Sequence, residues 1–433
     1  MPAKKSPDND PETQARIARL LARCEQMFRD EFAKGPRTLH DIEGDVELIG
    51  KVIKESITQE IVDEAGTGYA GSRMRCACGQ QAKFAGNRSR RIITLHGRLS
   101  FTRSYYYCRP CAAGSCPIDQ QLDIGSAGCS RTVQAHIART SAYLPFGQAA
   151  AELAAARGLV LSPSTVQRYA KAVGERLGKA WDQYQVQQLS GNLPAPDMIP
   201  ERLYISMDGV KVHLDGQWRD AKLGVVYRRN DEGKIIHACY YGSVEPSHAF
   251  GHRIRVLADL RASHCRDLQM LGDGAEWIWG ETRKHFPGCI ETLDFYHLTD
   301  HVDDIGQARF GKESEQAKQW LGDQKKRLLD DGPSPVIKDI AAWRTQGKTN
   351  KELQRTTLCY MQTHRDRIQY KTLRDAGYHI GSGMMESGCK CVVKSRLGGA
   401  GMRWGEPGAM AILHLSTHRH STGTHDFMPF TVS

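Results

Sequence analysis

The sequence predicts an α/β protein whose C-terminal half is built around one mixed sheet. Short β-branched runs alternate there with helix-like segments, and turn residues separate them. We expect strands over 203–214, 221–227 and 235–244, a helix over 248–260, a strand over 268–271, a helix over 275–285 and a strand over 290–293. Three strands, helix, strand, helix, strand is the order of an RNase H-like sheet, in which the first and fourth strands are neighbours.

Three carboxylates stand out in this half of the chain. Asp208 interrupts an apolar run, Asp273 ends another, and Glu386 lies just inside a predicted helix start. Acids at the ends of buried strands are unfavourable unless a cation compensates them. If the first and fourth strands are neighbours, Asp208 and Asp273 lie close together. Two aspartates and one helical glutamate can hold two Mg²⁺ ions for phosphodiester chemistry.

The predicted sheet is interrupted before Glu386. Residues 201–305 form the first part of the core, 306–375 a helical insertion with a small core of its own, and 376–420 the second part. Lys390 and Lys394 follow Glu386 by four and eight residues, so they share its helix face. They are suited to DNA phosphates, although ordinary helix-surface charge is the alternative.

The segment 1–70 is predicted to be helical, for packing or self-association, because apolar residues recur every three or four positions. The segment 71–120 contains a β-hairpin signal around His96-Gly97-Arg98 between two cysteine groups. This layout is typical of a zinc ribbon, and the alternative is a set of free structural thiols. Its candidate ligands, with the fourth position open between Cys76 and Cys116, are Cys76, Cys78, Cys108, Cys111 and Cys116.

The segment 121–185 is predicted to contain a helix-turn-helix, followed by a linker over 186–200. A first helix ends at Gly158, and Ser162 and Pro163 are typical of the start of a second helix. Arg168 and Lys171 give the second helix a basic side suited to DNA.

Charge also indicates a polyanionic partner. The net charge is +10, and nine basic residues face two acids between Gly71 and Ser130. We expect this stretch to contact phosphates, although a merely solvated basic face is the alternative. The sequence shows neither a membrane-length apolar run nor a secretory signal, so we expect a cytoplasmic protein with no membrane partner.

Several motifs carry a resemblance to a known family. Gly-Ser-Gly-Met-Met-Glu386-Ser-Gly-Cys-Lys390, with the Val-Lys394-Ser-Arg396-Leu and Gly-Met-Arg403-Trp-Gly-Glu-Pro-Gly-Ala that follow, resembles the C-terminal block of ISKra-type bacterial insertion-sequence transposases. These belong to the DDE superfamily and are related to the ISLre and Mutator groups. Asp208-Gly209 and Gly272-Asp273-Gly274 resemble the first two acids of the triad, and Asp294-Phe-Tyr-His297 resembles the Asp-x-x-His element of Mutator-like enzymes. The resemblance covers roughly residues 70 to 415.

The resemblance implies a DDE transposase that cleaves DNA and transfers strands. Asp208, Asp273 and Glu386 would hold two Mg²⁺ or Mn²⁺ ions, with Asp294 and His297 in a supporting role. The implied partners are double-stranded DNA, namely terminal inverted repeats and target DNA, and further copies of the chain, as a homodimer or higher oligomer on DNA. The implied location is the bacterial cytoplasm, in association with the nucleoid. We expect DNA contacts from Arg168, Lys171, Lys390, Lys394, Arg396 and Arg403.

Two other functions fit the same residues. One is a catalytically silent, transposase-derived repressor that keeps the DNA-binding modules without using the triad. The other is an RNase H-like nuclease that cuts without joining.

Overall fold

The computed structural model describes residues 11–196, 200–230, 232–262, 265, 267–423 and 426–431. The chain divides into two compact units, and its mixture of sheets and helices confirms the α/β class. The first unit contains the described residues of Met1–Ile137, Gly147–Tyr169 and Phe427–Ser433. The second contains those of Ala138–Phe146 and Ala170–Asp426.

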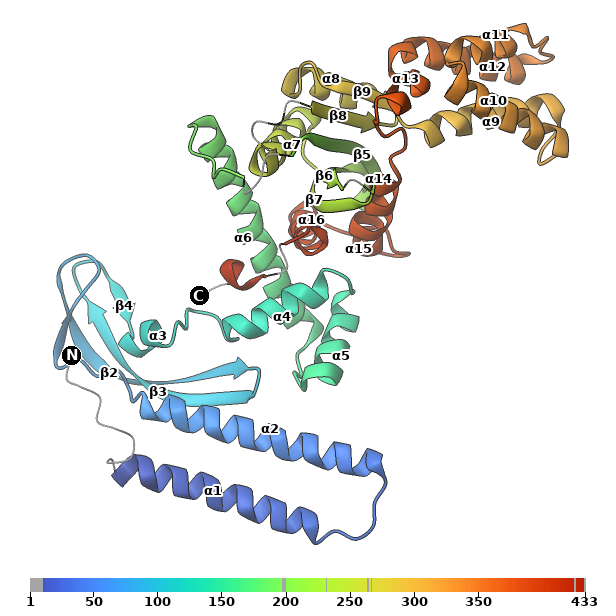
Figure 1. Cartoon of the computed structure of the whole chain (residues 1–433). Coiled ribbons are helices and arrows are strands. Elements are labelled where there is room, and N and C mark those ends of the chain that lie inside the picture. Colours follow the sequence, from blue (N-terminus) through green and yellow to red (C-terminus); the bar gives the residue numbers. More distant parts are fainter. Residues whose placement is uncertain are drawn as a thin grey trace. The chain divides into compact units, whose positions relative to one another are not determined.

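The first unit begins with two helices and a four-stranded antiparallel sheet (Figure 1). Thr94 pairs with Gly97, so the β2–β3 turn falls at 95–96, one residue before the predicted turn. Gly97 has a φ of 134°, which glycine adopts readily and other residues rarely do, and it is the first residue of the second strand. The elements are α1 (Pro11–Phe32), α2 (Leu39–Glu64), β1 (Arg73–Arg75), β2 (Gln81–Thr94), β3 (Gly97–Cys108) and β4 (Ala113–Ser115), in the order β1-β2-β3-β4.

Four helices follow the small sheet along the chain. The pair α5 and α6 has the predicted boundaries, because Gly158 at φ 61° ends α5 and the Ser162 hydroxyl accepts the Thr165 N–H at 3.2 Å. Helix α6 continues to Leu189, so the first residues of the predicted linker are helical. The helices are α3 (Pro117–Gln121), α4 (Arg131–Ser141), α5 (Phe146–Arg157) and α6 (Pro163–Leu189).

The second unit is organised around a five-stranded mixed sheet in the order β7-β6-β5-β8-β9. Strands β5 and β8 are parallel neighbours, which confirms the predicted adjacency of the first and fourth strands. Strand β6 is longer than predicted because it pairs with β5 from Gln217 onward, directly after a two-residue turn. The strands are β5 (Arg202–Leu214), β6 (Gln217–Arg229), β7 (Ile235–Ser243), β8 (Asp267–Gly272) and β9 (Ile290–Leu293).

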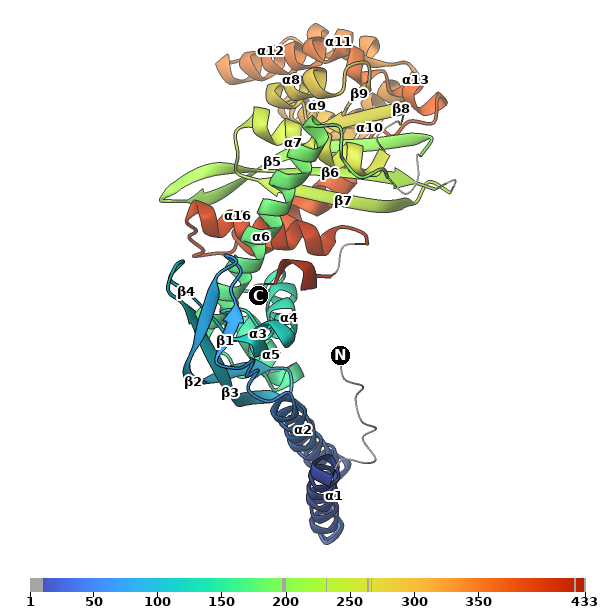
Figure 2. The same cartoon turned by 90° about the vertical axis from the view of Figure 1, so that its left-hand side faces the viewer.

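Helices cover both faces of this sheet (Figure 2). A methyl group on Gly224 would meet Ile254 of α7, whereas one on Gly388 would meet Leu223. Because neighbouring residues of a strand point to opposite faces, α7 and the segment around Gly388 lie on opposite faces. The covering elements are α7 (Ser247–Ala262) and α8 (Glu276–His285) on one face, and α14 (Gly383–Gly388), the π-helical turn η3 (Cys389–Lys394) and α16 (Glu406–His420) on the other.

The predicted insertion is helical and begins earlier than expected, because α9 starts directly after β9. Most of its buried apolar residues belong to the same apolar cluster as the sheet, so its core is continuous with that of the sheet. Leu328 and Ile340 are fully buried in that cluster, whereas Trp320 and Trp343 are only partly buried. The insertion comprises α9 (Phe295–Phe310), α10 (Glu315–Asp330), α11 (Pro333–Ala342), α12 (Lys348–Thr363), η2 (Arg365–Ile368) and α13 (Tyr370–Asp375), and the remaining elements are α15 (Ser395–Leu397) and η4 (Met428–Phe430).

Candidate active site

Asp208 and Asp273 occupy equivalent positions on neighbouring parallel strands. The last residues that β5 and β8 pair are Ser206 and Leu271, and each aspartate lies two residues further along the chain, Asp208 within β5 and Asp273 directly after β8. Side chains two residues apart point to the same face, so both carboxylates lie on the face that α14 covers. The strand register thus brings together two acids that are 65 residues apart in the sequence.

Asp294 extends the same row to the third strand. Gly272 pairs with Leu293, so Asp294 follows β9 as Asp273 follows β8. Only 5 % exposed, Asp294 accepts the His297 N–H at 2.7 Å, which caps α9. Its second carboxylate oxygen accepts the main-chain N–H of Ser382, the residue before α14. Asp294 therefore fixes the starts of two helices at the edge of the sheet.

Glu386 reaches the site from α14. Its side chain is 69 % exposed, and one carboxylate oxygen lies 2.6 Å from Lys390 Nζ. This contact lowers the pKa of Glu386. One residue before Lys390, the buried Cys389 thiol donates to Asp208 Oδ2 at 3.3 Å. The α14–η3 segment consequently carries Glu386 and covers Asp208 at the same time.

A cavity of about 660 Å³ unites these groups. Every predicted acid and the predicted pair Lys390 and Lys394 line it. Lys211 and Cys389 also line it and were not predicted as site residues. Little in the sequence around Lys211 marks it as a site residue. Cys389, in contrast, lies three residues after Glu386 in the Gly-Ser-Gly-Met-Met-Glu-Ser-Gly-Cys-Lys motif. The lining residues are Asp208, Gly209, Val210, Lys211, Asp273, Asp294, Tyr296, His297, Asp300, Ser382, Gly383, Glu386, Cys389, Lys390 and Lys394.

The electrostatics of the cavity suit a divalent cation. Burial raises the pKa of Asp208, and the nearby Asp273 carboxylate raises it further. Two carboxylates that disfavour each other's charge gain from a cation between them. Oxygen donors of this kind are the ligands preferred by Mg²⁺ and Mn²⁺. The donor chemistry of Asp208 and Asp273 is therefore compatible with a divalent metal ion.

The position of Asp273 depends on a residue that the sequence did not indicate. Tyr360 of α12 donates its hydroxyl to the main-chain carbonyl of Asp273 at 2.6 Å. Gly274 has a φ of 96°, and a methyl group there would lie 2.5 Å from the Tyr360 hydroxyl. Gly274 therefore lets the insertion pack directly on the turn that carries Asp273.

A separate group of four thiols lies in the first unit. Sγ of Cys76 lies 3.6 Å from that of Cys111, and Sγ of Cys78 lies 3.7 Å from that of Cys108. Among the residues that the structure describes, these four are the only group of three or more potential ligands whose donor atoms all lie within 4.8 Å of one another. A hydrogen bond from the Cys78 main chain lowers the pKa of Cys76 to about 7, which favours the thiolate that metals bind. This cluster can hold a metal such as zinc.

Cys116 is not part of the four-thiol cluster. It packs with Ile92, Leu99 and Phe101 in an apolar core, where burial raises the pKa of its thiol. Of the two alternatives for the fourth ligand, Cys76 and Cys116, the structure places Cys76 in the cluster. The spacing could not decide this, because the choice depends on how the loops that carry Cys76, Cys78 and Cys111 fold together.

The basic stretch of the first unit is partly used within the fold. Asp119 binds Arg90 at 3.1 Å and also pairs with Arg103, so these two arginines are largely buried and share one carboxylate within the fold. Arg88 lies over the Tyr105 ring at 3.3 Å. The basic residues of the stretch that remain exposed are Arg73, Arg75, Lys83, Arg88, Arg91, Arg98 and Arg109.

The predicted DNA contacts outside that stretch differ in accessibility. Arg168 and Arg403 are exposed, whereas Lys171 is half-buried and its side chain lies against Gly408. Arg396 is fully buried, its Nε donates to the Ser141 carbonyl at 2.7 Å, and burial lowers its pKa to about 10. A buried guanidinium cannot reach a phosphate, so we remove Arg396 from the expected DNA contacts. Within the described part of the chain, no helix has the length and apolarity that crossing a bilayer requires.

Comparisons with known proteins agree on one family. The model of an uncharacterised protein family, UPF0236, matches residues 42–426. A curated protein of Streptococcus gallolyticus, the UPF0236 protein in the vanSb 3′ region, is 24 % identical over 344 residues, which cover 76 % of this chain and 72 % of that protein. The family model spans the aspartate row and the helix that carries Glu386.

Proposed function

This chain belongs to the uncharacterised protein family UPF0236, and we propose that it is a DDE transposase that cleaves DNA and joins the cut strand to a target. The observation that carries the proposal is the row of Asp208 and Asp273 on neighbouring parallel strands, with Glu386 in the same cavity. The strand order β7-β6-β5-β8-β9 supports an RNase H-like core for this site.

Asp208, Asp273 and Glu386 are the residues that would hold two Mg²⁺ or Mn²⁺ ions. Bound there, such ions lower the barrier to phosphodiester cleavage by stabilising the negative charge that develops on the attacking and leaving oxygens. The two strand-borne aspartates are held by the sheet, and Glu386 is held through α14. Asp294 acts indirectly, because it anchors the residue that precedes α14.

Cations around the cavity are suited to the DNA backbone. Lys211, Lys390 and Lys394 line its wall with exposed ammonium groups. Ammonium groups attract phosphates without regard to base sequence. These lysines would hold the strand being cut in the cavity, while base recognition comes from elsewhere in the chain.

We assign DNA-end binding to the first unit. Its four-thiol cluster supports a zinc ribbon, and the exposed arginines of the small sheet are suited to phosphate contacts. Helices α5 and α6 support a helix-turn-helix, with Arg168 as an exposed residue on the second helix. The proposed partner is therefore double-stranded DNA that includes the terminal repeats of an insertion sequence, bound in the bacterial cytoplasm.

A cleavage assay tests the proposal. Labelled duplexes that cover the DNA flanking the gene for this chain are incubated with the protein, with and without Mg²⁺. Wild type should nick them only with the metal, and Asp208→Asn, Asp273→Asn and Glu386→Gln should each reduce nicking at least about 100-fold.

The matched control is Glu276→Gln. Glu276 is an exposed acid three residues after Asp273, and it does not line the cavity. This variant should nick like wild type. Metal-independent nicking, or equal nicking by wild type and the three carboxylate variants, would overturn the proposal.

A further inference from the structure

The helical hairpin α1–α2 has an apolar face without a partner in the described part of the chain. Neither helix has a single buried residue, although both carry large apolar side chains. In α1 these recur as Ile17, Leu21, Phe28 and Phe32, which fall within an arc of about 60° on a helix of 3.6 residues per turn. In α2, Leu39, Val46, Ile57 and Ile61 fall within a similar arc of about 60°. These eight side chains are between 41 and 84 % exposed.

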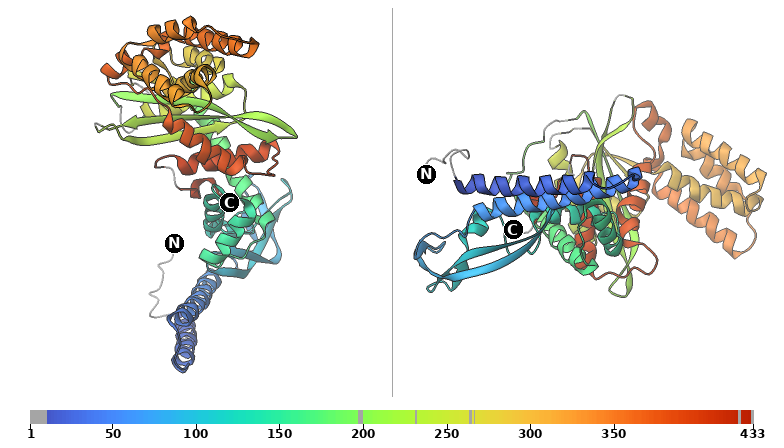
Figure 3. Two further views of the ribbon diagram at one scale, coloured as in Figure 1. Left: turned by 90° about the vertical axis from the view of Figure 1, so that its right-hand side faces the viewer. Right: turned by 90° about the horizontal axis from the view of Figure 1, so that it is seen from below.

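The two stripes form one continuous surface, which we call the hairpin face. Helices α1 and α2 run antiparallel side by side (Figure 3), and Arg23 of α1 donates to the Ser56 hydroxyl of α2 at 2.9 Å. The seam is marked by the half-buried positions Leu20, Cys24 and Met27 of α1 and Ile49, Val52 and Ser56 of α2. The stripe centre lies about 80° from the seam on α1 and about 120° on α2, in the same rotational sense along the chain. In an antiparallel pair, similar rotations from the seam bring both stripes to the same side of the hairpin.

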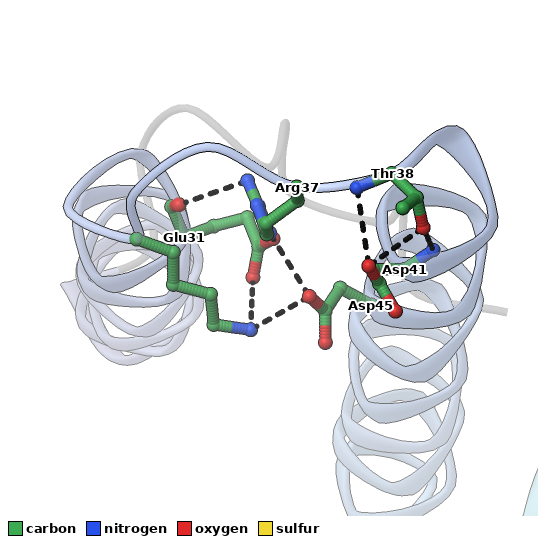
Figure 4. Close-up of polar contacts among 6 residues, drawn as sticks. Glu31, Arg37, Thr38, Asp41 and Asp45 are labelled. Atoms are coloured by element: carbon green, nitrogen blue, oxygen red, sulfur yellow. Dashed lines mark hydrogen bonds and ion pairs between the residues drawn. The ribbon is translucent and has the colours of Figure 1, made fainter.

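The turn of the hairpin is locked by charged contacts (Figure 4). Arg37 donates to Asp45 at 2.9 Å and to the Glu31 carbonyl at 3.2 Å, and Lys34 lies 2.8 Å from Glu31 and 2.9 Å from Asp45. Thr38 begins α2 with a capping box. These contacts fix both helices before any partner binds, so little order must be gained on association.

The charges that border the hairpin face favour a protein over DNA. Two exposed acids and three exposed bases lie along its outer edge, and a third exposed acid, Glu43, lies within the α2 stripe, so the charges of the face and its edge sum to zero. A phosphate-binding surface would be predominantly basic. A neutral surface with both signs allows a second copy to dock without net like-charge repulsion. The edge residues are Glu25, Arg29, Glu47, Lys51 and Lys54.

The area of the hairpin face suits a stable dimer. The 22 residues of α1 span about 33 Å, and two adjacent helices are about 20 Å wide, which gives a face of roughly 650 Å². A standard stable interface buries about 800 Å² on each partner. A two-fold interface requires the same patch on both copies, and two hairpins together make the four helices of an antiparallel bundle.

We propose that the hairpin face binds the hairpin face of a second copy of this chain, so that the protein is a dimer through a four-helix bundle before it meets DNA. Dimerisation through α1 and α2 does not depend on the active site or on metal. The proposal therefore stands or fails independently of the proposed transposase activity.

Sedimentation velocity of the full chain, treated with nuclease and free of divalent metal, tests the dimer. Wild type should be dimeric at about 10 µM, as expected for a standard-sized interface. Val46→Glu and Leu21→Glu should each raise the dimer dissociation constant at least about 100-fold, because each buries two charges in the bundle. Both positions are exposed in the single chain, so circular dichroism should show unchanged helix content.

Leu48→Glu is the matched control. Leu48 is as exposed as Val46, at 61 % against 58 %, and it lies two residues away on the opposite side of α2. This variant should dimerise like wild type. A monomeric wild type would overturn the proposal and indicate that the hairpin face binds a different protein. A dimeric Val46→Glu variant would also overturn it. So would dissociation of the dimer by Leu48→Glu to the same extent as by Val46→Glu.

Discussion

Replacing Asp294 by alanine should destabilise the second unit strongly, although no proposed metal ligand is touched. The carboxylate is 5 % exposed and accepts two main-chain N–H groups, one at His297 and one at Ser382. Loss of the helix cap at His297 removes about 0.5–2 kcal/mol. Loss of a charged acceptor at Ser382 removes about 1.5–3 kcal/mol more. The free energy of unfolding should therefore fall by about 2–4 kcal/mol, allowing for partial relaxation.

Asp294→Asn separates the two contributions. Asparagine caps helices about as well as aspartate, so its amide oxygen retains the His297 contact. Its NH₂ group cannot accept from Ser382, so one contact is lost. We expect a decrease in stability of about 1–2 kcal/mol, between wild type and alanine.

Urea unfolding followed by tryptophan fluorescence measures both variants without metal or DNA. Hydrogen exchange of the α14 amides measures the local effect, since Asp294 holds the residue before that helix. Exchange there should accelerate in Asp294→Ala. The reasoning would be refuted if Asp294→Ala unfolded within about 0.5 kcal/mol of wild type and left exchange in α14 unchanged.

Three further outcomes follow from the structure. Burial and the Asp273 carboxylate raise the pKa of Asp208 in the folded protein above its value in the unfolded chain. The free energy of unfolding therefore falls as the pH rises from the unfolded-state pKa of Asp208 through its folded-state pKa. Asp208→Asn should consequently raise the melting temperature at pH 7 without metal and have no such effect below the unfolded-state pKa; equal shifts at both pH values would contradict this. Purified protein should contain one zinc per chain by elemental analysis, and Cys108→Ser should lose it whereas Cys116→Ser should keep it. Arg168→Ala should weaken binding to the gene-flanking DNA about tenfold and reduce its salt dependence, and unchanged affinity would exclude the start of α6 as a DNA contact.

Local patterns were sufficient to predict the sheet of the second unit. Short apolar runs between turn residues located all five strands, and their order predicted that β5 and β8 are neighbours. Strand length was harder, because β6 extends through polar residues that pair with β5. Pairing with a neighbour depends on the register of the whole hairpin, which local propensity does not contain.

The part of the site that one short sequence motif contains could be predicted from the sequence. Glu386, Lys390 and Lys394 share a segment, so helix periodicity placed them together. The Tyr360 hydroxyl that supports Asp273 comes from 87 residues away, and nothing near Tyr360 marks it. Burial of Arg396 likewise depends on Phe146 and Trp404, whose rings lie 5.5 and 5.7 Å from its guanidinium carbon. From the sequence alone, an arginine in a basic motif is predicted to be exposed, because the aromatic residues that bury it are distant in the sequence.

A joining assay tests the proposed transposase activity most directly. A labelled duplex from the gene-flanking DNA, pre-cut to leave a free 3′-hydroxyl, is incubated with a supercoiled target plasmid, the protein and Mg²⁺. Wild type should produce plasmid covalently joined to the label, and Glu386→Gln should produce none. Cutting without joined product in wild type would indicate a nuclease, and equal joined product from Glu386→Gln would contradict the assignment of the carboxylates.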